Sequence, residues 1–167
     1  MTEQVARRVF DLGAYRRARR VLAYAAHGSE VGTDAVTAGI LKDGKGLILP
    51  RVTEEGLTLH RVDDPARDLV PGVWDIPEPD ARCPVVAPEE VELFLLPGLA
   101  FDLGGHRLGY GRGYFDRVLG RAPGEKVALA FDGQIVEAVP VGPQDVPVDA
   151  VITPTRVIRC GAAARTE

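Results

Sequence analysis

A glycine-rich stretch at residues 103–116 holds the residues whose types and spacing are best suited to chemistry. It contains five glycines, two arginines and a terminal aspartate. Glycine lets backbone N–H groups converge on an anion where a Cβ would collide or would forbid a positive φ, and a helix that begins just downstream adds unpaired N–H donors. Arg107 and Arg112 can donate charge-assisted hydrogen bonds to phosphate oxygens, and Asp116 can hold the Mg²⁺ of a nucleoside triphosphate. The stretch therefore predicts a phosphate-binding loop.

This loop matches neither of the two commonest glycine motifs. A Walker A loop ends in Gly-Lys-Ser/Thr, which is missing here, and the third glycine of the dinucleotide-binding motif is missing as well. The alternative is a glycine-rich turn before an ordinary helix, in which Asp116 only stabilises the helix dipole. The density of glycine, the arginines and the aromatic pair at 114–115 favour the phosphate loop.

Composition sets bounds on the kind of protein. A chain of 167 residues with 46% apolar content predicts one domain, residues 1–167, with a substantial core. The net charge of −4 gives no global attraction to nucleic acid or to an anionic membrane. Cys83 and Cys160 fit neither a zinc motif nor a disulfide framework, and no apolar run approaches the ~20 residues of a membrane span. We therefore expect a cytoplasmic protein that binds neither nucleic acid nor membrane and has no evident obligate protein partner.

Periodicity predicts strands that alternate with helices. Helices are expected at residues 5–12, 15–20, 34–41 and 114–119, with Thr33 as the N-cap of the third. Strands are expected at 21–25, 46–49, 57–62, 91–96, 126–131 and 148–153, whereas the proline-rich residues 63–84 are expected to wander over the surface. This order predicts an α/β fold, a three-layer α/β/α arrangement with a mostly parallel sheet.

Ligands of such sheets bind at the carboxyl ends of the strands. Three segments are expected there: residues 26–30, residues 97–113 and the segment that leads into Asp149. His27 lies in the first of them and is placed to face a substrate, although a lone histidine is more often a surface or core residue.

Several further motifs follow the order of one known family. The chain carries Pro-Gly-Leu-Ala-Phe-Asp at 97–102 and Arg-Leu-Gly-Tyr-Gly-Arg-Gly-Tyr-Phe-Asp at 107–116. It also carries Glu-Val-Gly-Thr at 30–33, Gly-Lys at 44–45 before Leu-Pro-Arg at 49–51, Trp-Asp-Ile-Pro-Glu-Pro at 74–79 and Val-Pro-Val-Asp at 146–149. Over residues 20–153 the chain thus resembles the 5-formyltetrahydrofolate cyclo-ligases, also called 5,10-methenyltetrahydrofolate synthetases.

The resemblance implies an ATP- and Mg²⁺-dependent ring closure. ATP would phosphorylate the formyl oxygen of 5-formyltetrahydrofolate, and N10 would then attack the activated carbon to leave 5,10-methenyltetrahydrofolate, ADP and phosphate. No protein nucleophile is needed, so catalysis would rest on positioning and on electrostatic stabilisation of the transferred phosphoryl group. The implied partner is a small-molecule folate.

The resemblance also implies roles for single residues. Residues 107–115 would bind ATP: Arg107, Leu108, Gly109, Tyr110, Gly111, Arg112, Gly113, Tyr114 and Phe115. Arg112 and Tyr114 would be catalytic, and residues 110–114 would also touch the folate. Asp116 and Asp149 would hold Mg²⁺, although Asp149 also reads as an ordinary turn residue before a strand.

Two residues outside the loop would hold the folate. Glu30 would accept hydrogen bonds from the pterin edge, and Trp74, the single tryptophan, would pack on the folate ring. The alternatives are a solvated acid for Glu30 and an anchor of the surface segment to the core for Trp74. Tyr114 and Phe115 either line the same pocket or belong to the core.

Two other functions remain open from the sequence. The family's N-terminal helix is expected to be shortened or absent here, and Tyr110 replaces a position that is commonly arginine. Both features suggest a folate- or nucleotide-binding relative that has lost efficient use of ATP. The third possibility is an RNA-binding or interaction domain that uses the arginine-rich N-terminus, which the acidic total disfavours.

Overall fold

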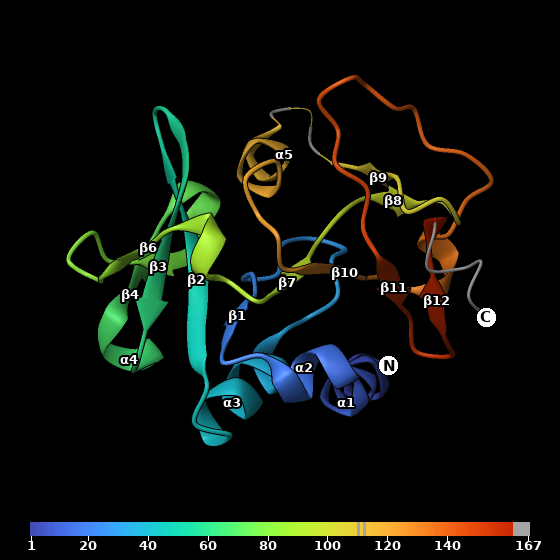
Figure 1. Ribbon diagram of the computed structural model, residues 1–167. Coiled ribbons are helices and arrows are strands. Elements are labelled where there is room, and N and C mark those ends of the chain that lie inside the picture. The colour runs from blue at the N-terminus through green and yellow to red at the C-terminus, as the bar shows by residue number, and fades with distance from the viewer. Residues whose placement is uncertain (110, 112, 162–167) are drawn as a thin grey trace.

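A computed structural model describes residues 1–109, 111 and 113–161. These residues form three layers, with one large sheet between two layers of helices and loops (Figure 1). The strand order in this sheet is β12-β11-β10-β7-β1-β2-β3-β6. The five strands from β11 to β2 run parallel, and β12, β3 and β6 add antiparallel edges. Their bounds are β1 Arg20–Leu22, β2 Gly46–Thr53, β3 Gly56–Val62, β6 Val85–Val86, β7 Leu93–Leu96, β10 Glu125–Leu129, β11 Ala150–Ile152 and β12 Val157–Arg159. The predicted α/β fold with a mostly parallel sheet is confirmed.

The central strands are buried on both faces. Alternate side chains of β7 enter two separate apolar clusters, Leu93 and Leu95 on one face and Phe94 and Leu96 on the other. Helices α1 (Thr2–Asp11), α2 (Gly13–Arg17) and α3 (Asp34–Lys42) cover the first face, and α5 (Tyr114–Leu119) covers the second. A strand with apolar residues on both faces reads as a continuous apolar run, which explains why the sequence predicted it well.

The loop between β1 and α3 is held by its own polar contacts. Thr33 occupies the predicted N-cap position of α3, but its hydroxyl donates to the Tyr24 carbonyl instead of accepting from an amide of the helix. The Tyr24 hydroxyl in turn donates to the Val31 carbonyl over 2.9 Å. These two contacts close the loop on itself and fix the segment that carries His27 and Glu30.

Residues 63–84 are more ordered than the sequence predicted. They form α4 (Pro65–Asp68) and an antiparallel hairpin of β4 (Leu69–Pro71) and β5 (Pro77–Pro79), with a 3₁₀ turn, η1 (Val73–Asp75), at its tip. The segment lies mostly at the surface, as expected, but the expectation that it wanders without regular structure is wrong. Proline is tolerated in such a small two-stranded sheet because every strand in it is an edge strand.

A second small hairpin leads into the predicted phosphate loop. It consists of β8 (Ala100–Phe101) and β9 (Arg107–Leu108) and lies on the same side of the sheet as α5 (Figure 1). Two further 3₁₀ turns, η2 (Pro88–Glu90) and η3 (Asp132–Gln134), complete the described elements. None of the helices in the described residues is long and apolar enough to cross a membrane.

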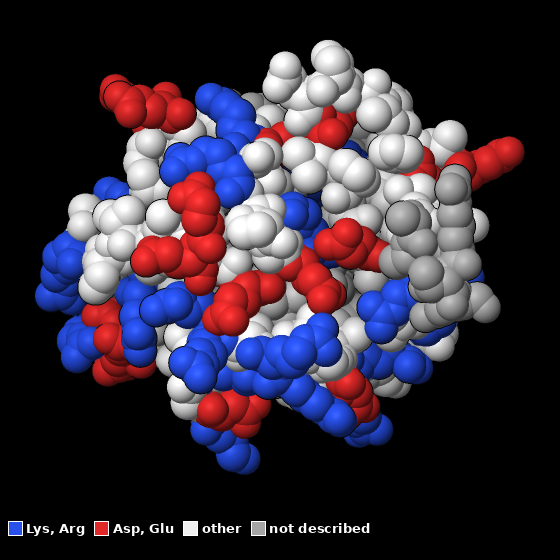
Figure 2. Space-filling model, in the orientation of Figure 1, with Lys and Arg blue, Asp and Glu red and all other residues white. Residues whose placement is uncertain are grey.

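Acidic and basic side chains are mixed on the surface. Figure 2 shows Lys and Arg side chains gathered over the lower part of the view, where the helices of the first face lie, with Asp and Glu side chains among them. Arg17 lies 3.2 Å from Glu125, and Arg16 lies 3.9 Å from Asp11. The basic run at 16–20 is therefore partly paired with acidic side chains, which does not favour a nucleic-acid surface.

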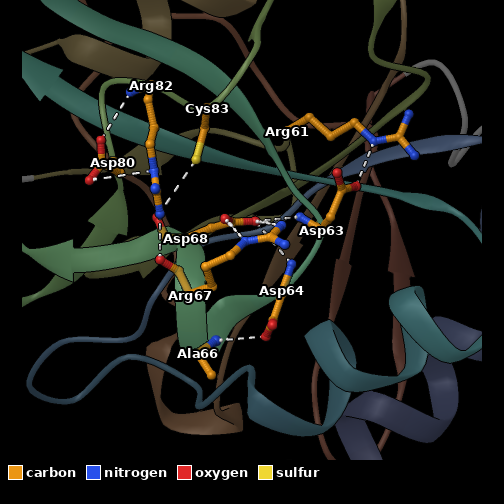
Figure 3. Close-up of polar contacts among 9 residues, drawn as sticks. All are labelled: Arg61, Asp63, Asp64, Ala66, Arg67, Asp68, Asp80, Arg82 and Cys83. Carbon is orange, nitrogen blue, oxygen red and sulfur yellow. Dashed lines mark hydrogen bonds and ion pairs between the residues drawn. The ribbon is translucent and has the colours of Figure 1, made fainter.

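Asp68 fixes the base of the β4–β5 hairpin (Figure 3). Its carboxylate, in a side chain only 9% exposed, accepts the backbone amides of Asp63 and Asp64 over 3.0 Å each and Nε of Arg67 over 2.8 Å. Its carbonyl accepts the Asp80 amide over 2.8 Å, which joins the two ends of the hairpin segment. The hydrogen bond from Arg67 is the main reason that the pKa of the Asp68 carboxyl lies well below its usual range, and the two backbone amides act in the same direction.

We expect Asp68→Asn to destabilise the protein more at neutral pH than in acid. Because the folded-state pKa is lowered, ionised Asp68 stabilises the fold above the ordinary pKa of about 3.9, and this contribution is lost as the pH falls through the folded-state pKa. Urea unfolding at pH 7 and at about pH 3 measures the difference, which should shrink on acidification. Asp63→Asn is the matched control, because the Asp63 carboxylate pairs with Arg61 at the surface. An equal loss for Asp68→Asn at both pH values would contradict the role of its charge.

Candidate active site

A cavity of about 480 Å³ lies at the carboxyl ends of the central parallel strands. Tyr24 and Ala25 line it after the end of β1, and Pro97 and Gly98 line it after the end of β7. Strand β2 continues beyond its partner β1 and adds Leu49, Pro50 and Val52 to the wall. A cavity of this size at this place is suited to a small-molecule ligand.

The three segments expected at the strand ends all reach this cavity. His27 and Glu30 line it from the first segment, the glycine-rich loop from the second, and Pro140 and Asp145 from the segment that leads into Asp149. The structure thus brings together most of the predicted site residues: Glu30, Trp74, Arg107, Leu108, Gly109, Gly111, Gly113, Tyr114, Phe115 and Asp116. Tyr110 and Arg112 lie outside the described residues.

Two structural features require glycine in this loop. Gly111 and Gly113 have φ values of 91° and 66°, and a Cβ at either would meet nothing within 4 Å, so the positive φ is what requires glycine. Gly105 also has a positive φ, of 87°, and a Cβ there would lie 2.3 Å from the Val148 carbonyl oxygen, so both its backbone conformation and the close approach of two segments require glycine. Gly111 and Gly113 therefore shape the loop before α5, as expected for a phosphate loop.

Arg107 is a buried cation in the cavity wall. Its side chain is 8% exposed, its Nη1 donates to the Pro97 carbonyl over 3.3 Å, and its Nη2 lies 3.6 Å from Oδ1 of Asp116. Its Nε is buried and has no hydrogen-bond partner, the single such side-chain atom in the described part of the chain. Burial lowers the pKa of the Arg107 guanidinium, and the carboxylates of Asp116 and Asp145 oppose this shift. An unsatisfied buried donor in a cavity wall is costly unless a ligand completes its hydrogen bonds.

Asp116 links α5 to the rest of the cavity. Its side chain is 17% exposed, and its Oδ1 both accepts the Val146 amide over 3.2 Å and pairs with Arg107. Asp116 therefore does more than stabilise the helix dipole, which was the simple alternative for this residue. A carboxylate beside a buried arginine in a cavity remains suited to hold a cation together with ligand phosphates.

Asp149 does not reach the cavity. It directly precedes β11 and therefore lies at the amino edge of the sheet, where its carboxylate accepts the Lys126 amide over 2.9 Å. The expectation that Asp149 joins Asp116 in one metal site is not supported by this placement. In the part of the chain that the structure describes, no three His, Cys, Asp or Glu side chains gather as a metal site. Of the two predicted metal ligands, Asp116 lines the cavity and Asp149 does not.

The aromatic residues line the cavity. Trp74 is 65% exposed at the tip of the β4–β5 hairpin, so it does not anchor this segment to the core. Its ring stacks on His27, with centroids 5.3 Å apart and an angle of 23° between the planes. Tyr114 and Phe115 also border the cavity, and Phe115 packs in addition against the second apolar cluster and lies 5.6 Å from the Arg107 guanidinium.

Two acidic residues of the cavity were missed by the sequence reasoning. Glu78 lines the cavity with a side chain 14% exposed and lies 3.4 Å from Nη1 of Arg51. Asp145 lines it as well, and its carboxylate accepts the Gly142 amide over 2.7 Å. Glu78 belongs to the motif at 74–79, so the sequence did contain a signal for it, whereas no motif pointed to Asp145.

The fold and the cavity define an α/β protein with a ligand-sized cavity at the carboxyl edge of its sheet. The family model of the 5-formyltetrahydrofolate cyclo-ligase family matches residues 1–154, including α1 and α2. The solved structure of Aquifex aeolicus 5,10-methenyltetrahydrofolate synthetase superposes with a TM-score of 0.84 at 37% identity, over 95% of this chain and 80% of that chain.

Curated relatives give the same result. The 5-formyltetrahydrofolate cyclo-ligase of Mus musculus is 32% identical over 83% of this chain and 74% of its own. The enzyme of that name in Escherichia coli K12 is 31% identical over 94% of this chain and 90% of its own. The chain belongs to the 5-formyltetrahydrofolate cyclo-ligase family and is an enzyme of that family.

Proposed function

We propose that the protein uses ATP and Mg²⁺ to convert 5-formyltetrahydrofolate into 5,10-methenyltetrahydrofolate, with release of ADP and phosphate. The conversion of the folate follows from the family. The use of ATP rests on one observation: Arg107, with its buried Nε lacking a partner, lies beside Asp116 and the positive-φ glycines in the same cavity as Trp74. That arrangement leaves strong donors available for phosphate oxygens next to an aromatic surface for a flat ring.

The residues present suit both expected ligands. When bound, ATP supplies the phosphoryl group that makes the formyl oxygen a leaving group, and Mg²⁺ offsets the charge of the phosphates. The guanidinium of Arg107 would donate hydrogen bonds to phosphate oxygens, and the amides of Gly111 and Gly113 would donate from the loop. Asp116 would contribute a carboxylate oxygen to Mg²⁺.

The folate would be oriented by residues from other segments that line the cavity. Glu30 would accept hydrogen bonds from the pterin edge, and the Trp74 ring would cover the pterin face. Both residues line the cavity. Tyr114 borders it too and would hold the reacting groups close together, while Arg112 and Tyr110 stay proposed contacts of phosphate and folate. The chain's contribution to the rate is then proximity and charge placement, with no protein nucleophile.

An assay of product formation tests this proposal. We expect the protein, given 5-formyltetrahydrofolate, ATP and Mg²⁺, to form the methenyl product, and to stop when ATP is omitted or Mg²⁺ is chelated. Product formation without ATP would contradict the ATP-dependent mechanism. Binding of the folate without any turnover would select the alternative, a folate- or nucleotide-binding relative that has lost catalysis. The cytoplasmic location stays a prediction.

A further inference from the structure

The stacked pair of Trp74 and His27 joins two segments that are distant in the sequence. Trp74 lies at the tip of the β4–β5 hairpin, and His27 lies in the loop between β1 and α3. Both side chains line the cavity, and the 23° angle between their rings leaves them nearly parallel. The pair therefore connects two walls of the cavity by one ring contact.

The backbone under Trp74 is unusual. Trp74 and Asp75 have φ values of 56° and 58°, and no other non-glycine residue in the described part of the chain has a positive φ. Such conformations are strained and persist where surrounding contacts enforce them, often at functional sites. Here the turn is closed by hydrogen bonds from the Asp75 amide to the Gly72 carbonyl and from the Ile76 amide to the Val73 carbonyl. These bonds fix the backbone, but they do not fix the rotation of the indole ring.

The supports on both sides of the stack are firm. The hairpin is held at its base by the Asp68 carbonyl and along β5 by Arg51, whose Nη1 donates to the Pro79 carbonyl over 2.9 Å. The His27 loop is held by the Tyr24 and Thr33 contacts, and the His27 carbonyl accepts the Glu30 amide over 3.2 Å. The imidazole is thus presented from a fixed loop to an indole that is 65% exposed.

We propose that His27 is a positioning residue: its ring holds the Trp74 indole in the orientation that binds the flat ring of the substrate. The role of the indole in substrate binding rests on the proposed function, whereas the positioning of Trp74 by His27 rests on the stacking contact alone. His27 sets the orientation of Trp74 through one contact, and it takes no part in the transfer chemistry. Its loss therefore weakens the folate complex and leaves the phosphate side of the cavity unchanged.

Steady-state kinetics of two His27 variants tests the proposal. His27→Ala removes the ring, and His27→Phe keeps a flat ring without its nitrogens. We expect His27→Ala to raise KM for 5-formyltetrahydrofolate by roughly three- to tenfold, the range of an aromatic pair, with kcat and KM for ATP near the parent values. His27→Phe should return KM to within about twofold of the parent. An unchanged or lowered KM in His27→Ala, or no rescue by His27→Phe, would overturn the proposal.

The single tryptophan supplies a readout that needs no turnover. In the ligand-free protein the fluorescence anisotropy of Trp74 should fall in His27→Ala, because the indole gains rotational freedom, and should recover in His27→Phe. Unchanged anisotropy in His27→Ala would overturn the hold of His27 on Trp74.

A double variant separates this inference from the proposed function. Adding His27→Ala to Trp74→Ala should give no further rise in KM, because both changes remove the same contact. Additive effects would mean that His27 acts apart from Trp74 and would overturn the proposal. If Trp74→Ala leaves KM unchanged while anisotropy still falls in His27→Ala, the substrate role of Trp74 is wrong and the positioning contact stands.

Discussion

Asp116→Asn is expected to lower turnover by about a hundredfold to a thousandfold, the range found when one electrostatic group of an active site is removed. The asparagine keeps the shape and can still accept the Val146 amide, but it removes the charge that pairs with Arg107 and that would hold Mg²⁺. The product assay measures kcat of the variant and of the parent at saturating ATP. It also measures the Mg²⁺ concentration that gives the half-maximal rate. That concentration should rise in the variant.

Asp149→Asn is the informative control for this prediction. The family resemblance gives Asp149 a metal role, whereas the structure places its carboxylate on the Lys126 amide at the amino edge of the sheet. We therefore expect Asp149→Asn to keep turnover near the parent value, with at most a modest loss of stability. If the two variants lose turnover equally, Asp149 belongs to the site in the working enzyme. If Asp116→Asn keeps both its rate and its Mg²⁺ requirement, the carboxylate serves only to connect α5, Arg107 and the segment at 146.

The sequence predicted best those elements whose residues are determined by local pattern. The helix expected at 114–119 is α5, because the glycines end at Gly113 and the helix can begin at the next residue. The strand expected at 91–96 includes β7 (Leu93–Leu96), because these four consecutive apolar residues are buried; the structure begins the strand only after Glu92. The glycine-rich loop was recognisable for the same reason, since positive φ at Gly111 and Gly113 demands that residue type.

What the sequence could not predict depends on contacts between distant residues. The β4–β5 hairpin has prolines at both Pro71 and Pro77, which face each other, and no apolar alternation marks its strands. It is held instead by the buried carboxylate and the carbonyl of Asp68, and neither contact has a pattern in the sequence. The same is true of Thr33, whose position was predicted but whose hydroxyl partner, Tyr24, lies nine residues before it.

The site was predictable to the extent that one topological rule applied. Loops that follow parallel strands meet at the carboxyl edge, and this rule alone brings together the loops at 26–30 and 97–113. The same rule places Asp149 outside, because it precedes a strand rather than following one. Orientation is the part that pattern does not give: Glu78 and Asp145 face the cavity, and only the fold could reveal it.

Arg107→Gln is expected to weaken ATP binding by about ten- to hundredfold, as for the loss of hydrogen bonds between charged partners. Glutamine can still reach the cavity, but it removes the charge and the Nε donor that has no partner in the protein. Arg107→Lys keeps the charge without the planar set of donors, so its affinity should lie between those of the parent and Arg107→Gln. Calorimetric titration of each protein with ATP and Mg²⁺ gives the affinities.

The pairing of Arg107 with Asp116 supplies the control for this last prediction. Removal of Arg107 leaves the Asp116 carboxylate, only 17% exposed, without its cation, so some loss of affinity could come from a disturbed cavity instead of a lost phosphate contact. Arg107→Gln combined with Asp116→Asn removes both charges and should recover part of any stability lost in the single variant, measured by thermal unfolding. Its ATP affinity should nevertheless stay low, because the phosphate donor is still missing. Parental ATP affinity in Arg107→Gln, or its full recovery in the double variant, would mean that Arg107 supports the cavity wall and does not contact the nucleotide.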